Sequence, residues 1–240
     1  MPGPARRTVA LLRRLGADRS GLALLEFAFA GPLVLALGLY GVEMGNQALT
    51  HMRVSQIALS IADNASRMGA LQSGNIEQMR EGDMNDVLQA ARLQGAGIKL
   101  GTYGRIIISS LENVQQSYDL VPVQRIHWQR CMGLKSATGY PSSYGTTTTT
   151  AGTTATVSDA GTTALLGMGD TGRKVSAPSG SGLIFVEVNY EYQPIVSGWL
   201  AKPFRMHYVA SMIVRNNRDF KQIYNPLNSA TPSTCNLYAA

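Results

Sequence analysis

A run of 21 residues near the N-terminus, Leu22 to Val42, constrains this chain more than any other feature. Sixteen of the 21 are apolar, and Glu26 is the only charged residue among them. As an α-helix the run would be about 31 Å long, which matches the hydrocarbon thickness of a bilayer. The run therefore predicts one transmembrane helix over 22–42 rather than the buried core helix of a soluble protein, and no second run of this length follows.

The flanking charges predict the orientation of this helix. Residues 1–21 carry a net charge of +4, whereas Arg53 is the only basic residue between Glu43 and Ala62. Because basic segments stay in the cytoplasm, we expect the N-terminus to be cytoplasmic and everything after Val42 to be exported. The whole chain has a net charge of +6. Only +2 therefore lies outside the leader, which argues against a nucleic-acid partner.

A cleavable secretory signal is an alternative, because it combines the same basic and apolar regions. Two sites have the small residues that signal peptidase recognises, Ala28-Phe29-Ala30 and Ala36-Leu37-Gly38. The first leaves a short apolar stretch that Glu26 interrupts, and the second encloses both Glu26 and Gly31-Pro32. We therefore favour a helix that stays in the membrane.

The start of the span carries a recognisable motif. The string Arg19-Ser20-Gly21-Leu22-Ala23-Leu24-Leu25-Glu26-Phe27 resembles the type IV prepilin processing motif, a glycine followed by four mostly apolar residues and a glutamate. With Phe27 after Glu26 and a basic segment before Gly21, the chain most resembles the TadE-like family of minor pilins, or pseudopilins, of tight-adherence (Flp) pili. Pro32 also matches that family's pattern. The resemblance covers residues up to about 70 and a C-terminal hairpin over 183–215.

The resemblance implies how the chain matures. Prepilin peptidase would remove residues 1–21 by cutting after Gly21, so that Leu22 becomes the N-terminus and Glu26 the fifth mature residue. Glu26 would then pair with the N-terminal amine of a neighbouring subunit and set the register between helices. In an uncleaved signal anchor, Glu26 would instead reach toward the interface. The implied partners are prepilin peptidase, other pilin or pseudopilin subunits, the assembly machinery and the inner membrane.

Helical periodicity continues beyond the span. Apolar residues recur at helical spacing in a stripe made of Val54, Ile57, Ala58, Ile61, Ala65 and Met68. This predicts an amphipathic stalk helix over 43–70, whose stripe packs on the chain's own C-terminal domain or, as the alternative, on a partner subunit. Gly69 and Gln72-Ser73-Gly74 predict its end, and a second helix is predicted over Ile76 to Leu93.

Strand patterns dominate the remainder, so we expect an α+β fold in which 71–240 forms an exported domain with an antiparallel sheet. The expected strands are Arg105 to Ser110, Val121 to Arg130, Leu183 to Tyr192 and Met206 to Arg215. In the third strand Phe185, Glu187, Asn189 and Glu191 share one face, and Val186, Val188, Tyr190 and Tyr192 share the other.

A segment rich in Thr, Gly and Ser interrupts the strands at about 136–182. It includes five consecutive threonines at 146–150. Small polar residues bury little apolar surface, so we expect a flexible surface loop.

Cys131 and Cys235 are the only cysteines, and both lie on the expected exported side. An even count in an oxidising compartment predicts one disulfide between them, with two free thiols as the alternative.

The sequence offers no catalytic signature. The three histidines, His51, His127 and His207, are far apart and show no metal-ligand spacing, and phosphate-loop, nucleophile-elbow and dinucleotide motifs are lacking. We therefore expect no catalytic residues, no metal and no cofactor, and a minor pilin or pseudopilin that acts in pilus assembly, priming or adhesion. The alternatives are a signal-anchored exported binding protein unrelated to pili and an exported hydrolase whose catalytic residues are scattered in sequence.

Overall fold

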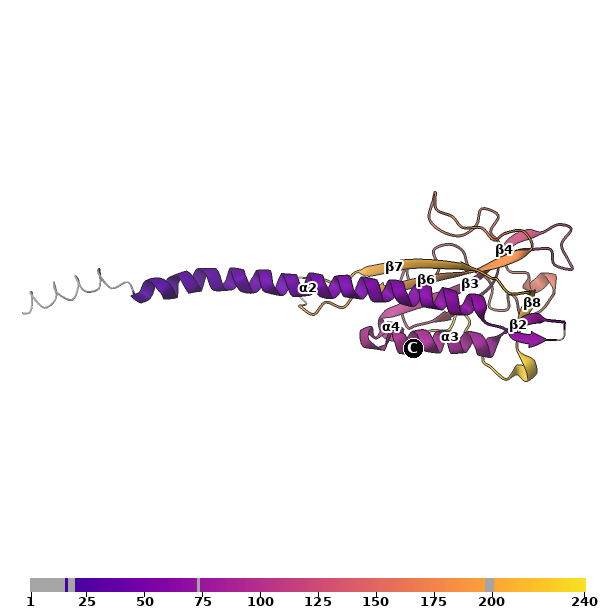
Figure 1. Ribbon diagram of the computed structural model, residues 1–240, viewed down its shortest axis with the longest axis horizontal. Helices are drawn as coiled ribbons and strands as arrows, with labels where there is room; N and C mark the ends of the chain where they lie inside the picture. The colour runs from indigo at the N-terminus through magenta and orange to yellow at the C-terminus, as the bar shows by residue number, and fades with distance from the viewer. Residues whose placement is uncertain (1–15, 17–19, 73, 197–200) are drawn as a thin grey trace, which may run out of the picture. The chain divides into compact units, whose positions relative to one another are not determined.

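The computed structural model describes residues 16, 20–72, 74–196 and 201–240, and its first long element is one continuous helix. This helix, α2, spans Ser20–Arg67 and contains Pro32 (Figure 1). It includes both the apolar run and the amphipathic segment, and it ends just before Gly69, where the sequence predicts the end. By length and composition alone, α2 is the one helix among the described residues that could cross a membrane.

The described chain divides into two compact units. The first comprises residues up to 46 together with 194–202, and the second comprises 47–193 together with 203–240. The second unit combines helices with two sheets, as the expected α+β class requires. Its elements are β1 (Ala70–Gln72), β2 (Ile76–Arg80), α3 (Glu81–Gln94), η1 (Ala96–Ile98), α4 (Leu100–Tyr103), β3 (Gly104–Val114), β4 (Val123–Met132), η2 (Val157–Asp159), β5 (Thr162–Thr163), β6 (Ser181–Glu191), β7 (Arg205–Ile213), β8 (Arg218–Tyr224) and η3 (Pro226–Asn228).

The larger sheet is antiparallel throughout and has the strand order β5-β4-β3-β6-β7. Its four long strands overlap the four predicted from sequence. The smaller sheet has the order β1-β2-β8, in which β2 and β8 run parallel.

The second predicted helix begins later than expected. Residues Ile76–Arg80 form strand β2, and the helix α3 starts at Glu81. The strand forms because Glu77 and Gln78 pair with Arg218 and Asp219 of β8, a partner far away in sequence. Acidic Glu81 and Asp83 then lie in the first turn of α3, where the helix dipole favours negative charge.

One face of the larger sheet packs against helices. The predicted stripe of α2 is buried there: Val54, Ile57, Ala58, Ile61 and Ala65 are each no more than 3% exposed. It shares a core with α3 and with Ile106, Ile108, Val186 and Val188 of the sheet. The stripe therefore packs on the chain's own domain, and each fully buried Val or Ile side chain in it contributes on the order of 1.5–3 kcal/mol.

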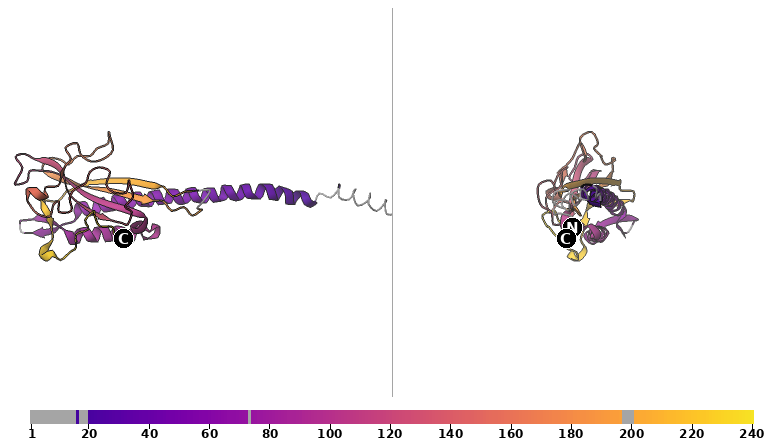
Figure 2. Two further views of the ribbon diagram at one scale, coloured as in Figure 1. Left: turned by 180° about the vertical axis from the view of Figure 1, so that it is seen from behind. Right: turned by 90° about the vertical axis from the view of Figure 1, so that its left-hand side faces the viewer.

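The opposite face is covered by the segment between β4 and β6, as the two views in Figure 2 allow the reader to follow. A second apolar cluster lies there, made of Leu111, Ile126, Met168, Ala177, Leu183 and Phe185 with Tyr144, Ala164 and Val175 packed against it. At Gly161 the backbone has a φ of +83°, and a Cβ atom would overlap the carbonyl oxygen of Ile126. The Thr/Gly/Ser-rich segment is thus largely irregular but packed on the sheet, and its flexibility stays a prediction.

A register shift in β4 places Ile126 and Trp128, which are two residues apart, on opposite faces of the sheet. Ser110 pairs with Trp128, whereas the next residue, Leu111, pairs with Ile126, so His127 is an extra residue in β4. Trp128 consequently joins the helix-side core and Ile126 joins the loop-side cluster.

Candidate functional site

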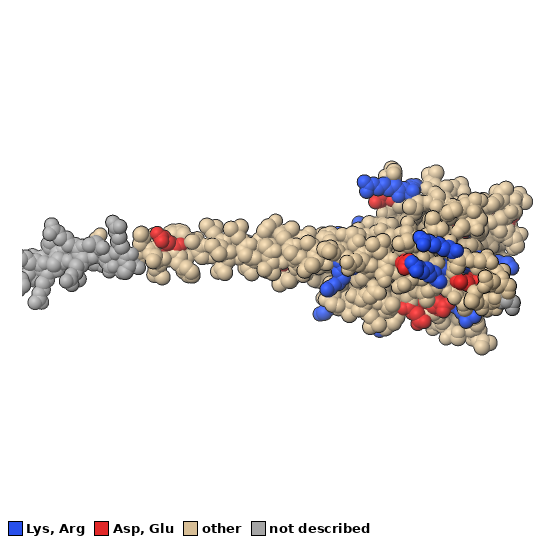
Figure 3. Space-filling model, in the orientation of Figure 1, with Lys and Arg blue, Asp and Glu red and all other residues tan. Residues whose placement is uncertain are grey.

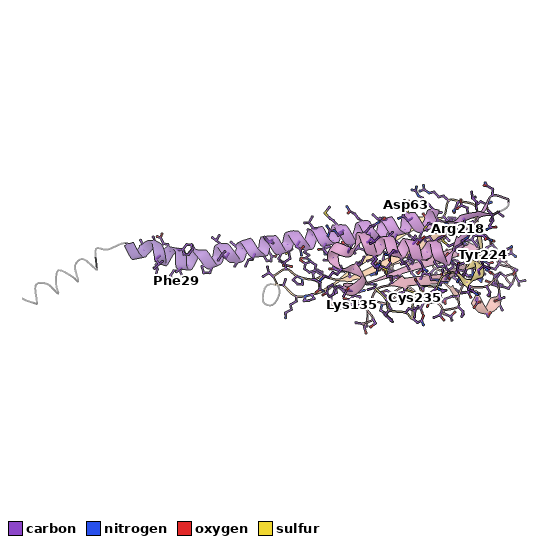
Figure 4. The ribbon with its side chains drawn as sticks, turned by 90° about the horizontal axis from the view of Figure 1, so that it is seen from below. Phe29, Asp63, Lys135, Arg218, Tyr224 and Cys235 are labelled. Carbon is purple, nitrogen blue, oxygen red and sulfur yellow. A yellow bond between two sulfur atoms is a disulfide. The ribbon has the colours of Figure 1, made fainter. Side chains whose placement is uncertain are left out.

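The first part of α2 is apolar on every side, and its side chains are exposed. Leu24, Phe27, Phe29 and Leu37 each have more than 70% of their surface exposed, and Figure 4 shows Phe29 projecting from the helix. A helix that is apolar on all sides requires an apolar environment. The described residues do not cover this part of α2 and so do not provide one. On the face shown in Figure 3, acidic colour interrupts this part of α2 at one place near its start.

Gly21 and Leu22 lie in the first turn of α2, next to the residues that the structure leaves undescribed. Gly21 is exposed, and a Cβ atom at this position would meet no atom within 4 Å. Leu22 is 52% exposed. A larger side chain at Gly21 therefore fits the described structure without collision, which makes this position a clean probe of recognition by a protease.

Glu26 is exposed on the same helix, and the described part of the chain provides it with no ion pair. A carboxylate within a bilayer costs about 2.5–3.5 kcal/mol at the centre and less near the interface, and a cationic partner offsets this cost. Its neighbour Phe27 folds its ring toward the next turn, where a Cβ atom at Gly31 would lie 3.7 Å from the ring. Most of the surface of the Phe27 side chain is nevertheless exposed, so a partner helix could contact both side chains of the motif.

A second glutamate, which the sequence analysis did not single out, marks the end of the apolar run. Glu43 is only 3% exposed. Its Oε2 accepts hydrogen bonds from the consecutive backbone N–H groups of Ile195 and Val196, at 3.0 and 2.9 Å. The position of Glu43 directly after Val42 was the available signal, but its partners lie about 150 residues later in the sequence.

The two cysteines meet at the end of β4. Cys131 and Cys235 form a disulfide, as predicted, and Figure 4 labels Cys235. The C-terminal tail continues along β4, since Cys131 N–H donates to the carbonyl of Ser233 and Gly133 N–H donates to that of Ala239. The disulfide therefore attaches the tail to the sheet edge that it covers.

Polar side chains between the sheet and its covering loop form a third cluster. Glu187 is fully buried and accepts hydrogen bonds from the Ser142 hydroxyl and the Ser143 N–H. Burial raises the pKa of the Glu187 carboxyl, against the opposing effect of these two bonds. Asn189 Oδ1 accepts a 2.7 Å bond from His207 Nδ1. The two bonds to Glu187 hold the loop on β6, and the bond between Asn189 and His207 joins β6 to β7.

A buried Ser, Glu and His lie together on β3 and β4, but in an order unlike a hydrolase triad. Ser110 Oγ donates to Glu112 Oε1 at 2.5 Å, and His127 Nδ1 lies 2.8 Å from Glu112 Oε2. The acid thus stands between the hydroxyl and the imidazole, whereas a nucleophilic serine needs the imidazole as its neighbour. Among the described residues, no group of three His, Cys, Asp or Glu side chains is placed to hold a metal ion.

Comparison of the chain with protein-family models, with curated proteins and with solved structures finds no match in any of the three. Only the residues and the geometry of the chain itself bear on its function. Its structure places Gly21, Leu22, Glu26 and Phe27 on one exposed helical segment and joins Cys131 to Cys235 in the folded domain.

Proposed function

We propose that this chain is a minor pilin or pseudopilin of a tight-adherence (Flp) type pilus, which acts in pilus assembly, priming or adhesion and catalyses no reaction itself. The observation that carries the proposal is the exposed carboxylate of Glu26, the only charged residue in the apolar first part of α2, five residues after Gly21 and behind a basic segment. Such a helix needs a lipid or helical environment, and such a carboxylate needs a cation.

Processing would supply that cation. Cleavage by prepilin peptidase between Gly21 and Leu22 creates a new α-amino group close to the membrane interface. In a growing assembly this amine pairs with Glu26 of a neighbouring subunit, so that two charges that are costly in lipid neutralise each other. Because the amine of Leu22 and the carboxylate of Glu26 are four residues apart in each chain, the pairing fixes the axial offset between adjacent helices.

The rest of the chain is then the exported part of an inner-membrane protein. The segment 22–42 crosses the membrane, residues 1–21 face the cytoplasm until they are removed, and the α+β unit faces the periplasm or the exterior. A disulfide between Cys131 and Cys235 suits an oxidising compartment of this kind.

The test is the intact mass of the protein purified from membranes of cells that express prepilin peptidase. A chain that starts at Leu22 supports the proposal. A chain that starts at Met1 indicates a signal-anchored protein unrelated to pili, and a chain that starts after Ala30 or Gly38 indicates a secretory signal; either result overturns it.

A pair of matched variants makes the test specific. Gly21→Phe should leave unprocessed precursor in the membrane, because the bulky side chain blocks the residue before the cut. Gly41→Phe places the same side chain at a glycine of the same helix that also has no atom within 4 Å of its Cβ position. This control should mature normally, and normal maturation of Gly21→Phe would remove the support from the motif.

A further inference from the structure

The two edges of the larger sheet, β4 with the short β5 on one side and β7 on the other, differ in how far their backbone groups are paired. The β4 edge is covered: β5 pairs with Arg125 and Ile126, and the carbonyl of Gln124 accepts a bond from Ala164 N–H. Farther along, the C-terminal tail accepts bonds from the N–H groups of Cys131 and Gly133. Almost the whole length of this edge is therefore paired or shielded, which is how proteins prevent uncontrolled strand pairing.

The β7 edge is open. Tyr192 N–H donates to Phe204 O, and Val214 N–H donates to Gly182 O. Because hydrogen-bonded pairs alternate along an antiparallel ladder, the even-numbered residues of β7 bond to β6 and the odd-numbered ones direct their N–H and C=O groups outward. Among the described residues, no backbone or side-chain partner is found for these outward groups. They belong to Arg205, His207, Val209, Ser211 and Ile213.

Nothing along this edge discourages a partner strand. Residues 206–214 contain no charged residue and no proline, and the register with β6 is continuous from Arg205 to Ile213. Val209 and Ile213 are 38% and 50% exposed beside the open backbone groups. Long, regular and uncharged edges are the ones that accept another strand.

We propose that the outer edge of β7 is a binding site for an extended strand of a different protein chain, which adds to the sheet by β-augmentation. Five outward residues set its length, and the exposed Val209 and Ile213 select apolar side chains at alternate positions. Arg205 and Arg215 are exposed at the two ends and form no ion pair within the described chain. The Arg205 guanidinium also donates to the carbonyl of Gly139 and to Asn189 Oδ1, both of them uncharged acceptors, so its charge is not neutralised there. Charge complementarity therefore selects acidic residues on either side of the apolar stretch.

A second copy of this chain fits less well. Antiparallel pairing over the full length of two β7 edges would place Arg205 of each chain opposite Arg215 of the other. Like charges directly opposite each other destabilise a strand pair, so a strand of a different chain with acidic ends is the better occupant.

The test uses the full mature chain in lipid nanodiscs and a synthetic probe peptide. The probe has the sequence Asp-Thr-Val-Thr-Val-Thr-Val-Glu with blocked termini, and a second peptide with proline in place of the central valine is its control. We expect saturable binding of the probe, no binding of the proline peptide, and slowed amide hydrogen exchange at His207, Val209, Ser211 and Ile213.

Two variants block the edge in different ways. Val209→Pro removes an outward N–H without breaking a bond to β6, and Ser211→Lys keeps the backbone but adds a charge. Each should weaken probe binding at least tenfold. The control, Leu93→Lys, adds the same charge at a 66% exposed position of α3 and should bind like the unmodified chain.

Three results would overturn the proposal. These are a folded chain that does not bind the probe, protection that falls outside β7, and protection of the same amides without peptide that increases with protein concentration. The last would identify a second copy as the occupant. The start of the mature chain is measured separately by mass. A chain that begins at Leu22 but does not bind the probe would therefore overturn the β7 binding site and leave the proposed pilin function standing.

Discussion

The guanidinium of Arg105 donates a hydrogen bond of 2.6 Å to the carbonyl oxygen of Cys235, the residue whose sulfur is bonded to Cys131. Arg105 also donates to the carbonyls of Leu237 and Gly133 and lies 4.2 Å from the ring centre of Tyr238. It is 1% exposed, and burial lowers the pKa of its guanidinium. The disulfide and this buried cation therefore hold the same tail.

Removing the disulfide should destabilise the folded domain. Cys131 and Cys235 are 104 residues apart, and closing a loop of this size is worth about 4–5 kcal/mol in the chain-entropy model. We expect Cys131→Ala/Cys235→Ala to lose about 3–5 kcal/mol of unfolding free energy, measured by urea unfolding in detergent with near-UV circular dichroism. An unchanged midpoint would show that the tail contributes little to the fold.

The Arg105→Lys variant tests whether cation and disulfide act together. A lysine ammonium cannot reach the three carbonyls that the guanidinium fork reaches, so we expect a loss of about 2 kcal/mol. Once the disulfide is absent, the tail carbonyls are no longer fixed and the same substitution should cost less. A double-mutant cycle should give a coupling of at least about 0.5 kcal/mol. Strict additivity would mean that the tail stays in place without the sulfur link.

Glu81 and Arg130 provide a third test of the domain interior. Their side chains are both 1% exposed, and Arg130 Nε donates to Glu81 Oε2 at 2.8 Å. Glu81→Gln would leave the guanidinium buried without its counter-charge, so we expect a loss of about 3–5 kcal/mol. The matched control is Asp63→Asn in the exposed pair with Arg67, which should cost less than about 1 kcal/mol in the same unfolding assay.

The pH dependence of stability should carry a contribution from His207. Burial, with a smaller effect of Arg205, lowers the pKa of His207 below its ordinary value of 6.5. The folded state therefore binds a proton less readily than the unfolded state. The stability that neutral His207 contributes is present above pH 6.5 and is lost as the pH falls through the lowered pKa.

His207→Gln should flatten the loss of stability on acidification from pH 7 toward pH 5, as followed by melting temperature. Glu187 acts with the opposite sign, because its pKa is raised above 4.5 and its contribution is lost as the pH rises. Glu187→Gln should therefore not flatten the loss of stability on acidification that His207 causes. A His207→Gln profile parallel to that of the unmodified chain would contradict the assignment.

The sequence alone predicted the features that depend on neighbouring residues or on residue type, namely the buried face of α2 and the disulfide. The spacing of Val54, Ile57 and Ile61 defines a buried helix face whatever lies against it, and the two cysteines had only each other as intramolecular partners. Strand β2 was missed because it gains its structure from β8, which follows about 140 residues later. The partners of Glu43 and Arg105 were missed for the same reason, since backbone groups of distant segments leave no residue-type signal in the sequence.

The sharpest prediction for the membrane segment concerns the charge of Glu26. Glu26→Val removes a group that is costly in lipid, so insertion into the membrane should be normal or improved. Assembly should nevertheless fail, because the new amine of a neighbouring Leu22 loses its partner and the offset between helices is no longer fixed. Glu26→Gln keeps the shape and removes only the charge, and it should fail in the same way.

The matched control is Leu33→Val, a change between apolar residues on the same exposed helix, which should assemble normally. Counting pili by electron microscopy, with membrane levels of the subunit held equal, separates these outcomes. Undiminished piliation in Glu26→Gln would show that the carboxylate is dispensable and that shape alone sets the register.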